Sequence, residues 1–166
     1  MSSPLDDLDR RLLALFANEP RVGVLEASRR LGVARGTVQA RLDRLDAIGV
    51  VTGWGPDVSP AALGYPVTAF VTLQIVQHGG RDQLIARLAA IPELLECWTI
   101  TGSGDLWCRV VAHSNADLQR VLDRMVTDEG VVRASTLIAL AEPVPYRTGP
   151  LVRDGGGDRG GSPPGR

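Results

Sequence analysis

Basic charge is gathered in one stretch of this chain. Between residues 28 and 45, five arginines are opposed by a single carboxylate, although the whole chain has a formal net charge of −1. Each phosphate that an arginine neutralises releases counterions, so a nucleic acid favours such a concentration of charge. The stretch predicts a surface for double-stranded DNA, and its alternative is an ordinary solvated face of a surface helix. The five arginines are Arg29, Arg30, Arg35, Arg41 and Arg44.

The side chains best suited to reading bases begin a third predicted helix. Val38, Leu42, Leu45 and Ile48 recur at helical spacing and must pack inward, which leaves the other side chains outside or on the flanks. Arginine can bond both acceptors of guanine, glutamine can bond adenine, and small residues let a helix approach the major groove closely. The predicted DNA-binding residues are Arg35, Gly36, Thr37, Gln39 and Ala40 at the groove, with Arg41 and Arg44 at phosphates.

Two shorter helices precede this one and a wing follows it. Apolar residues at helical spacing predict a first helix that begins directly after its cap, Ser3, and ends before Pro20. A second helix is predicted over residues 24–31, because its apolar face ends at a glycine. Residues 50–56 read as the first strand and turn of a wing. Residues 1–53 therefore predict an N-terminal winged helix-turn-helix domain.

The rest of the chain predicts a second domain of mixed α+β class. Residues 54–65 contain prolines and small residues without a clear period and read as a linker. The order strand, helix, two strands, helix, strand then predicts a ferredoxin-like βαββαβ domain over residues 66–148. Residues 149–166 lack an apolar period and predict a disordered tail. The predicted strands cover residues 67–76, 95–101, 106–112 and 131–140, and the helices cover 84–91 and 116–126, with Asn115 as a cap.

Composition excludes several classes of protein. No apolar run approaches the about 20 residues that cross a bilayer, and the N-terminus is acidic, unlike a signal peptide, so we expect a cytoplasmic protein without membrane contact. Cys97 and Cys108 are too few and too far apart for a zinc knuckle or a disulfide framework, and we interpret them as small buried residues. No nucleophile stands beside a base, and neither paired carboxylates nor a phosphate loop occurs. We therefore expect neither an enzyme nor a bound cofactor or metal.

The basic residues of the whole chain are all arginines. There are 18 of them and no lysine. The planar fork of arginine suits bidentate contacts to phosphate and guanine. A compositional bias of the genome produces the same pattern, and the sequence alone does not separate the two causes.

Taken together, these motifs resemble the Lrp/AsnC family of transcriptional regulators, also called leucine-responsive or feast-or-famine regulators. The resemblance covers residues 5–148, and the order and spacing of the motifs together are more specific than any single motif. The runs that carry it are Leu5-Asp6-Asp7-Leu8-Asp9 leading into Leu12-Leu13, Arg41-Leu42-Asp43-Arg44-Leu45-Asp46-Ala47-Ile48-Gly49-Val50-Val51, Leu63-Gly64, Glu96-Cys97-Trp98-Thr99-Ile100-Thr101-Gly102 followed by Asp105, and Gly130-Val131 followed by Thr136.

The resemblance implies partners and a second site. It implies double-stranded DNA as one partner and an amino acid as a small-molecule effector, bound between dimers by the RAM- or ACT-like second domain. It also implies homodimers built through the sheets, which assemble into larger rings. We expect an octamer, and the residues alone do not distinguish an octamer from a dimer. In the implied effector loop, the backbone can donate to a carboxylate while Asp105 takes an α-ammonium group. The implied effector-binding residues are Gly102, Ser103, Gly104, Asp105 and Thr136.

The chain also departs from the family pattern. Ala34 stands where the family commonly caps the recognition helix with serine, a loss of about 1 kcal/mol of capping. Ser103 and Gly104 replace residues that are often acidic and aromatic, and Ala134 replaces a common threonine. Three alternatives stay open. Turn chemistry alone selects glycine and aspartate, so residues 102–105 can be a plain hairpin that binds no ligand. The altered loop suggests an architectural DNA-binding protein without an effector, and the two-domain architecture also resembles that of the siroheme decarboxylases, which are enzymes.

Overall fold

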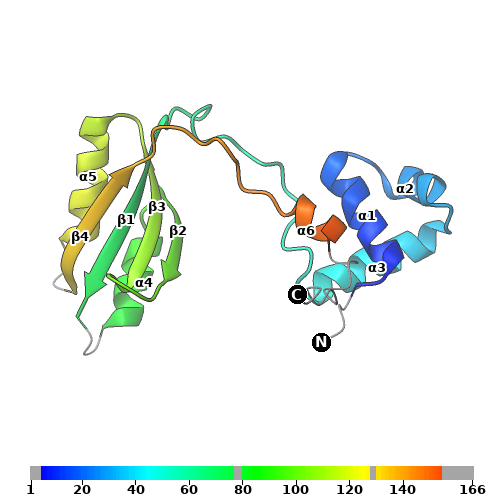
Figure 1. Cartoon of the computed structure of the whole chain (residues 1–166), viewed down its shortest axis with the longest axis horizontal. Coiled ribbons are helices and arrows are strands. Elements are labelled where there is room, and N and C mark those ends of the chain that lie inside the picture. The colour runs from blue at the N-terminus through cyan, green and yellow to red at the C-terminus, as the bar shows by residue number, and fades with distance from the viewer. Residues whose placement is uncertain (1–4, 77–79, 128–129, 155–166) are drawn as a thin grey trace, which may run out of the picture. The chain divides into compact units, whose positions relative to one another are not determined.

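The computed structural model describes residues 5–76, 80–127 and 130–154, which form two compact units (Figure 1). The first unit takes the chain up to Pro56 together with the segment from Val144 onward, and the second is Asp57–Pro143. Each unit has a hydrophobic core of its own. Residues 144–154, which the sequence divides between the second domain and a tail, thus belong with the first unit.

The first unit is built on three helices, α1 (Asp7–Asn18), α2 (Val24–Leu31) and α3 (Arg35–Ala47). The turn between α2 and α3 begins at Gly32, whose φ of 69° is left-handed and ends α2 as predicted. One apolar face from each helix meets in a shared core, which is the helix-turn-helix arrangement. The buried core residues are Leu12, Ala27, Val38, Leu42 and Leu45.

The predicted start of the first helix was wrong. Helix α1 begins at Asp7, and Asp6 caps it by accepting from the Asp9 backbone N–H at 2.9 Å, while the Asp9 carboxylate accepts from the Asp6 N–H at 3.0 Å. This reciprocal capping box satisfies two N–H groups that a helix end leaves without partners. Ser3, the predicted cap, lies outside the described residues. A similar shift occurs in the second unit, where Ser114 caps the helix that Asn115 was predicted to cap.

The wing predicted at residues 50–56 was also wrong, because this segment contains no strand. The backbone N–H groups of Val50 and Val51 both donate to the Leu45 carbonyl, at 2.9 and 3.1 Å. Both side chains also pack against the core of the three helices. The segment therefore closes the end of α3, and its backbone donors are committed to that helix.

A further helix, α6 (Gly149–Asp154), lies in the segment for which the sequence predicts disorder. It packs against α1, and the Arg10 guanidinium donates to the Val152 carbonyl at 3.4 Å. The contacts that position this helix come from a distant part of the chain, so local composition could not indicate it. The remainder of the predicted tail, residues 155–166, lies outside the described residues.

The second unit confirms the predicted order of strands and helices. Its four strands form one antiparallel sheet in the order β2-β3-β1-β4, and α4 and α5 pack on one face of it (Figure 1). Alternate residues of β1 are buried against the helices, as the period of two predicts. The elements are β1 (Val67–Ile75), α4 (Arg81–Ala89), β2 (Leu94–Thr99), β3 (Leu106–Ala112), α5 (Asn115–Val126) and β4 (Val131–Ile138).

The other face of this sheet is aromatic and carries no helix of the second unit. Phe70 of β1 stacks on Trp107 of β3, with ring centroids 5.1 Å apart. Trp98 opposes Trp107 and is 60% exposed, and Leu137 opposes Phe70 and is 69% exposed. We call the surface formed by these four side chains the open sheet face. Among the described residues, no helix is both long enough and apolar enough to cross a membrane.

Candidate functional site

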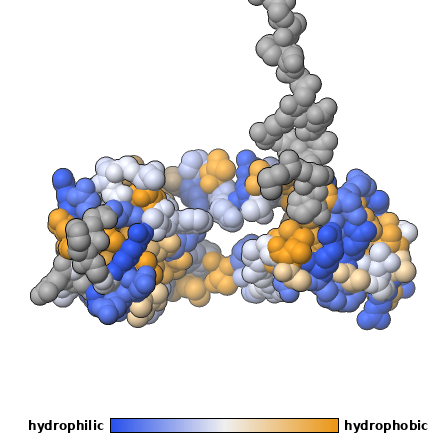
Figure 2. All heavy atoms as spheres, turned by 90° about the horizontal axis from the view of Figure 1, so that it is seen from below, coloured by the Kyte–Doolittle hydropathy of each residue, from blue (hydrophilic) through white to orange (hydrophobic). Residues whose placement is uncertain are grey.

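The N-terminal half of α3 presents the predicted base-reading residues to solvent. Val38 is buried in the core, whereas the side chains around it on the first two turns are exposed. Ala34, the N-cap, offers no side-chain hydrogen bond, as the sequence predicts. Figure 2 shows hydrophilic residues over much of the visible surface of this unit, on the right of the view. The exposed residues are Arg35, Gly36, Thr37, Gln39 and Ala40.

Two of these exposed side chains can bond to bases in different ways. Arg35 is the first residue of α3 and makes no hydrogen bond or ion pair with any residue that the structure describes. Gln39 donates from Nε2 to the Asp43 carboxylate at 2.8 Å, one turn farther along α3. Arg35 can therefore turn toward a partner without losing a contact, whereas Gln39 must exchange one.

Arg41 and Arg44, which the sequence assigned to phosphates, lie against the N-terminus of α1. Arg41 Nη1 lies 2.9 Å from Asp9 Oδ1 and also contacts Asp6, while Arg44 contacts the other carboxylate oxygen of Asp9. The Arg41 side chain is only 30% exposed. These ion pairs tie α3 to α1 and give both guanidinium groups carboxylate partners, although the Arg44 side chain is still 42% exposed.

Asp9 is the centre of this cluster and is fully buried, with an exposed fraction of 0%. Burial alone would raise the pKa of Asp9, but hydrogen bonds from Arg41, the Asp6 backbone and Arg44 together hold its pKa below the usual value. The carboxylate is therefore charged at neutral pH. A buried charge of this kind stabilises a structure only while its partners remain in place.

The rest of the basic stretch is partly neutralised as well. On α2, Arg30 bonds to Glu19 at 2.6 Å and to Glu26 at 2.9 Å, and Arg29 lies 3.9 Å from Glu26. These carboxylates lie outside residues 28–45, so a count of charges within that stretch alone overestimates its net positive charge. Among the arginines of α3, Arg35 is left as the one without an ion pair to any carboxylate that the structure describes.

The second predicted site forms a hollow of about 260 Å³ at one end of the sheet. The turn between β2 and β3 supplies most of its wall, and it is joined there by the end of β1 and the start of β4. Gly102 has a φ of 116°, in the left-handed region that favours glycine. The residues that line the hollow are Gln74, Ile75, Gly102, Ser103, Gly104, Asp105 and Val132.

Hydrogen bonds hold this turn against β1. The Asp105 N–H donates to the Leu73 carbonyl, the Ile75 N–H donates to Asp105 Oδ2, and Gln74 Nε2 donates to the Ser103 carbonyl, each at 2.8 Å. Asp105 therefore has a structural task besides the predicted one, because one of its carboxylate oxygens satisfies a strand N–H.

The close approach of the turn to β1 explains the glycine between Ser103 and Asp105. A Cβ atom on Gly104 would lie 2.2 Å from Thr72 Cγ2 and 3.2 Å from the Leu73 carbonyl oxygen. A side chain fits there only if the Thr72 side chain moves and the Leu73 carbonyl gives way by a few tenths of an ångström. The glycine that departs from the family pattern is therefore required by the packing of this chain.

Thr136 is the one predicted effector residue that this chain does not bring to the hollow. It lies farther along β4, opposite Val71, whereas the β4 residue at the hollow is Val132. Val71 is buried against the helices, and directly opposed residues share a face of the sheet, so Thr136 faces the helical side.

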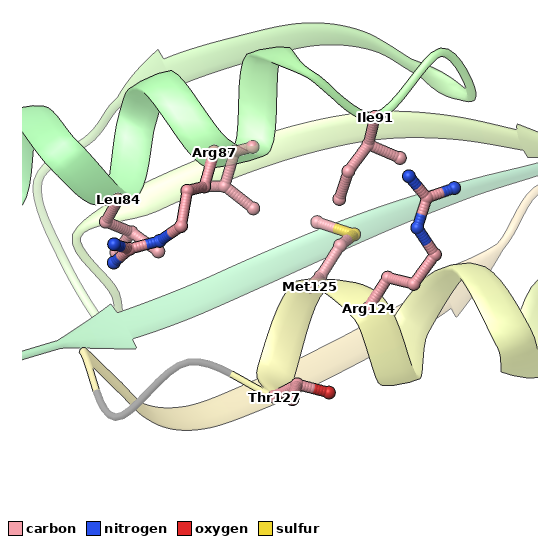
Figure 3. A pocket seen from close by; sticks show the side chains of 7 residues that line it. Leu84, Arg87, Ile91, Arg124, Met125 and Thr127 are labelled. Atoms are coloured by element: carbon pink, nitrogen blue, oxygen red, sulfur yellow. The ribbon is translucent and has the colours of Figure 1, made fainter.

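A larger hollow, of about 430 Å³, lies between α4 and α5 (Figure 3). Its floor is apolar, with Leu84 from α4 and Met125 from α5, and Arg87 and Arg124 line it from the two helices. Arg124 also pairs with the buried carboxylate of Glu93 at 3.3 Å. No sequence pattern marks this hollow as a site, because Leu84 and Met125 have the spacing of core positions and Arg87 and Arg124 that of ordinary helix positions.

Asp9 and Gln74 were not predicted as site residues, although Asp9 centres the ion pairs that hold α3 and Gln74 lines the hollow. Asp6 and Asp9 have the spacing of a capping box, and that signal could have placed both carboxylates at the start of α1. Gln74 has no comparable signal, because it lines the hollow only through the pairing of β1 with β3. Residues that meet through sheet register cannot be found from local pattern alone.

Both units match known protein families. Residues 5–46 match the family model of the AsnC-type helix-turn-helix domain, and residues 68–148 match that of the Lrp/AsnC ligand binding domain. The HTH-type transcriptional regulator FL11 of Pyrococcus furiosus is 30% identical over 140 residues, which cover 84% of this chain and 92% of that protein.

Two solved structures are similar over most of their length. AsnC of E. coli superposes with a TM-score of 0.81 at 28% identity, covering 89% of this chain and 100% of the other. The feast or famine regulatory protein of M. tuberculosis complexed with L-methionine gives a TM-score of 0.78 at 31% identity, covering 87% of this chain and 97% of the other.

Proposed function

This chain belongs to the Lrp/AsnC family of transcriptional regulators, and from that premise we propose that it reads operator DNA with the exposed half of α3 and senses an amino acid at the hollow beside Asp105. The observation that carries the first half is the solvent-exposed surface formed by Arg35, Gly36, Thr37, Gln39 and Ala40. We call this surface the reading face. Its first turn has the residue types that enter a major groove and bond to base edges.

The contacts of the arginines of α3 support different roles for them. Arg35 is the base-reading residue, because its guanidinium contacts no described residue. Arg41 and Arg44 act as positioning residues, because their bonds to the Asp9 cluster fix the orientation of α3 on α1. The phosphate contacts predicted for these two arginines remain a proposal, and they require the guanidinium groups to serve Asp9 and DNA at once.

Selection of bound sequences from a random pool of duplex DNA tests the DNA-binding half. We expect the full chain to enrich a sequence with two-fold symmetry, since a dimer places its two reading helices on related half-sites. A fluorescently labelled duplex of that sequence should then bind more tightly than a scrambled duplex of the same length and composition. Equal affinity for the two duplexes would contradict specific recognition.

The effector half of the proposal depends on the chemistry of the hollow. The backbone N–H groups of Gly102, Ser103 and Gly104 donate to no described residue, so they can bind a carboxylate. Asp105 supplies negative charge for an ammonium group, and Gln74 adds an amide at the rim. A hollow of about 260 Å³ suits a molecule smaller than the ligands of typical pockets, which measure about 300–1,000 Å³. The similar structure from M. tuberculosis is complexed with L-methionine, which fits this chemistry.

Replacing Asp105 by asparagine separates the two tasks of this residue. Asparagine can still accept from the Ile75 N–H, but it removes the charge that an α-ammonium group would meet. We expect the Asp105→Asn variant to bind L-methionine at least about tenfold more weakly in calorimetric titration, because hydrogen bonds to charged groups contribute about 1.5–3 kcal/mol. Circular dichroism without ligand establishes that the variant is folded.

A panel of standard amino acids serves as the control for this titration. If the parent binds another amino acid and the variant loses it, the site is the proposed one with a different ligand. If the parent binds none of them, the architectural alternative without an effector is favoured. If parent and variant bind the amino acid with equal affinity, the charge of Asp105 does not contribute to binding.

We also propose that the open sheet face is the dimer interface. Large aromatic and aliphatic side chains gather there without a covering element of the second unit, and exposed apolar patches of this kind mark interaction sites. A two-fold dimer brings each copy of the face against its equivalent. Larger assemblies, including the expected octamer, would be built from such dimers.

Placing a charge on the open sheet face should weaken this dimer. Leu137 is 69% exposed in the single chain, so Leu137→Arg costs the folded subunit little, but a dimer would bury the charge twice. We expect sedimentation to show at least about a tenfold higher dissociation constant than the parent. The control is Leu25→Arg, at an exposed leucine of α2, which should sediment like the parent. An unchanged Leu137→Arg assembly would place the interface elsewhere.

We propose a non-enzymatic role in the cytoplasm, where such a regulator meets the chromosome. The siroheme decarboxylase alternative calls for histidines and arginines around a tetrapyrrole. Here His113 bonds to the Gly64 carbonyl at 2.6 Å and stacks on Tyr65, so its ring is engaged in packing the start of the second unit. His78 lies outside the described residues. Tetrapyrrole absorbance in the purified protein would favour the enzyme.

A further inference from the structure

The two cysteines of the chain lie side by side on neighbouring strands. Cys97 of β2 is directly opposite Cys108 of β3 in the antiparallel register, and their Sγ atoms are 3.7 Å apart. Directly opposed residues of an antiparallel pair have Cα atoms about 4.5–5.5 Å apart, which lies within the range that disulfides span. The interpretation of both cysteines as buried residues was wrong for Cys97, which is exposed.

The position of Cys97 makes both access and movement possible. Strand β2 is at the edge of the sheet and pairs only with β3, so a small shift of β2 breaks no other ladder. The β2–β3 register is already irregular between Leu94 and Glu96, just before Cys97. Forming an S–S bond of about 2.05 Å requires the two sulfur atoms, now 3.7 Å apart, to approach each other by about 1.7 Å. Cys108 faces the helices, so the pair lies on the side of the sheet opposite to the open sheet face.

From this geometry we propose that Cys97 and Cys108 form a reversible thiol–disulfide couple that hydrogen peroxide oxidises. It is a modification site independent of the DNA and effector proposals. Cys97 is the sulfur that the oxidant reaches, and Cys108 is the sulfur that resolves the oxidised intermediate.

The reaction balances with peroxide as the only oxidant. The Cys97 thiolate attacks one peroxide oxygen, the O–O bond breaks, and Cys97 becomes a sulfenic acid while the departing hydroxide takes a proton to form water. The Cys108 sulfur then attacks the Cys97 sulfur, the S–O bond breaks, and the hydroxide leaves as water with the Cys108 proton. The two thiols together lose two electrons, and one peroxide becomes two waters.

The burial of Cys108 and the exposure of Cys97 determine which thiol reacts first. Burial, followed by the proximity of Cys97, raises the pKa of the Cys108 thiol to about 12. Cys108 also donates its S–H to the Cys97 sulfur, so it keeps its proton while Cys97 meets solvent. Since a protonated thiol attacks slowly, the second step should be slower than the first, and the sulfenic acid should last long enough to be trapped.

The test treats the full chain with hydrogen peroxide, alkylates the remaining thiols with N-ethylmaleimide in denaturant and measures the intact mass. We expect the oxidised parent to lose two hydrogen masses and to accept no maleimide, and dithiothreitol to restore two maleimide additions. Digestion should give one peptide pair linked between Cys97 and Cys108. Oxygen added to Cys97 with Cys108 still alkylated, a covalent dimer as the main product, or two unreacted thiols would each overturn the proposal.

Two variants check the order of steps. Cys108→Ala should stop at the sulfenic acid of Cys97, which dimedone traps, and Cys97→Ala should not react over the time in which the parent is fully oxidised. Circular dichroism establishes that each variant is folded. Rapid oxidation of Cys97→Ala at its buried thiol would contradict the assigned roles, and the result for the parent stands without either variant.

Discussion

Replacing Asp9 by asparagine is expected to lower the free energy of unfolding of the helical unit by about 2–3 kcal/mol, because it leaves two guanidinium groups without their shared carboxylate. Asparagine keeps the shape of the side chain and can still accept from the Asp6 N–H, so the loss isolates the charge. Arg41 and Arg44 are 30% and 42% exposed, and water offsets part of the effect. Hydrogen exchange of α1 and α3 amides measures the change in this unit alone.

The matched control is Asp7→Asn, one residue into the same helix. Asp7 is 87% exposed and lies 3.9 Å from Arg11, and such a surface pair contributes at most about 1 kcal/mol. If the Asp7 and Asp9 variants are equally stable, the buried cluster does not hold α3 on α1. That result would favour Arg41 and Arg44 as phosphate contacts, as the sequence predicts.

The effect of Asp9 should also depend on pH with a defined sign. Because the pKa of Asp9 is held below its usual value in the folded chain, its charge stabilises the fold above the unfolded pKa near 4. That contribution is lost as the pH falls through the lower folded pKa. The stability difference between parent and Asp9→Asn should therefore be full at neutral pH and shrink in acid. A difference that stays constant down to pH of about 2 would contradict the charged cluster.

Apolar spacing predicted most of the fold because burial follows it directly. Val38, Leu42 and Leu45 were expected to face inward from a helix, and all three are buried in the core of the first unit. The alternation along β1 likewise predicted which residues meet α4 and α5. Helix ends were less predictable, since Ser3 and Asp6 both have the chemistry of a cap and only the reciprocal bond from Asp9 separates them.

The features that the sequence could not predict depend on contacts between parts of the chain that are distant in sequence. Two apolar residues after α3 resemble a strand, yet Val50 and Val51 bond back to Leu45 because the helical core offers them an acceptor and a packing surface. The segment at 149–154 resembles a tail, yet it forms α6 against α1. In each case the missing information was the identity of the neighbour in space.

The same reason limits what the sequence could say about the candidate sites. The sequence placed both Arg35 and Arg41 on the DNA-binding surface, but one side chain meets solvent and the other meets two carboxylates. The Gly102–Asp105 turn was found because its residues are contiguous. Thr136 was grouped with it through family resemblance, and this chain leaves it on the helical side of β4.

Replacing Arg35 by alanine is expected to weaken binding to the selected operator by about 2 kcal/mol, or roughly thirtyfold, because one good bidentate contact to a base contributes about 1–3 kcal/mol. The exposed Arg35 side chain makes no hydrogen bond or ion pair with the described residues, so the variant should unfold like the parent. Fluorescence anisotropy at several salt concentrations measures affinity for the operator and for a scrambled duplex. The operator should lose more affinity than the scrambled duplex does.

Two further variants separate base reading from simple charge. Arg35→Lys keeps the charge but loses the planar fork, so it should bind the scrambled duplex like the parent and still lose preference for the operator. Arg29→Ala removes an exposed arginine of α2 that pairs only loosely with Glu26, and it should lower both affinities to the same small extent. If Arg35→Lys retains the full preference, Arg35 contacts a phosphate. The reading face would then depend on the neighbouring side chains of α3, above all Gln39, whose amide must leave Asp43 to reach a base.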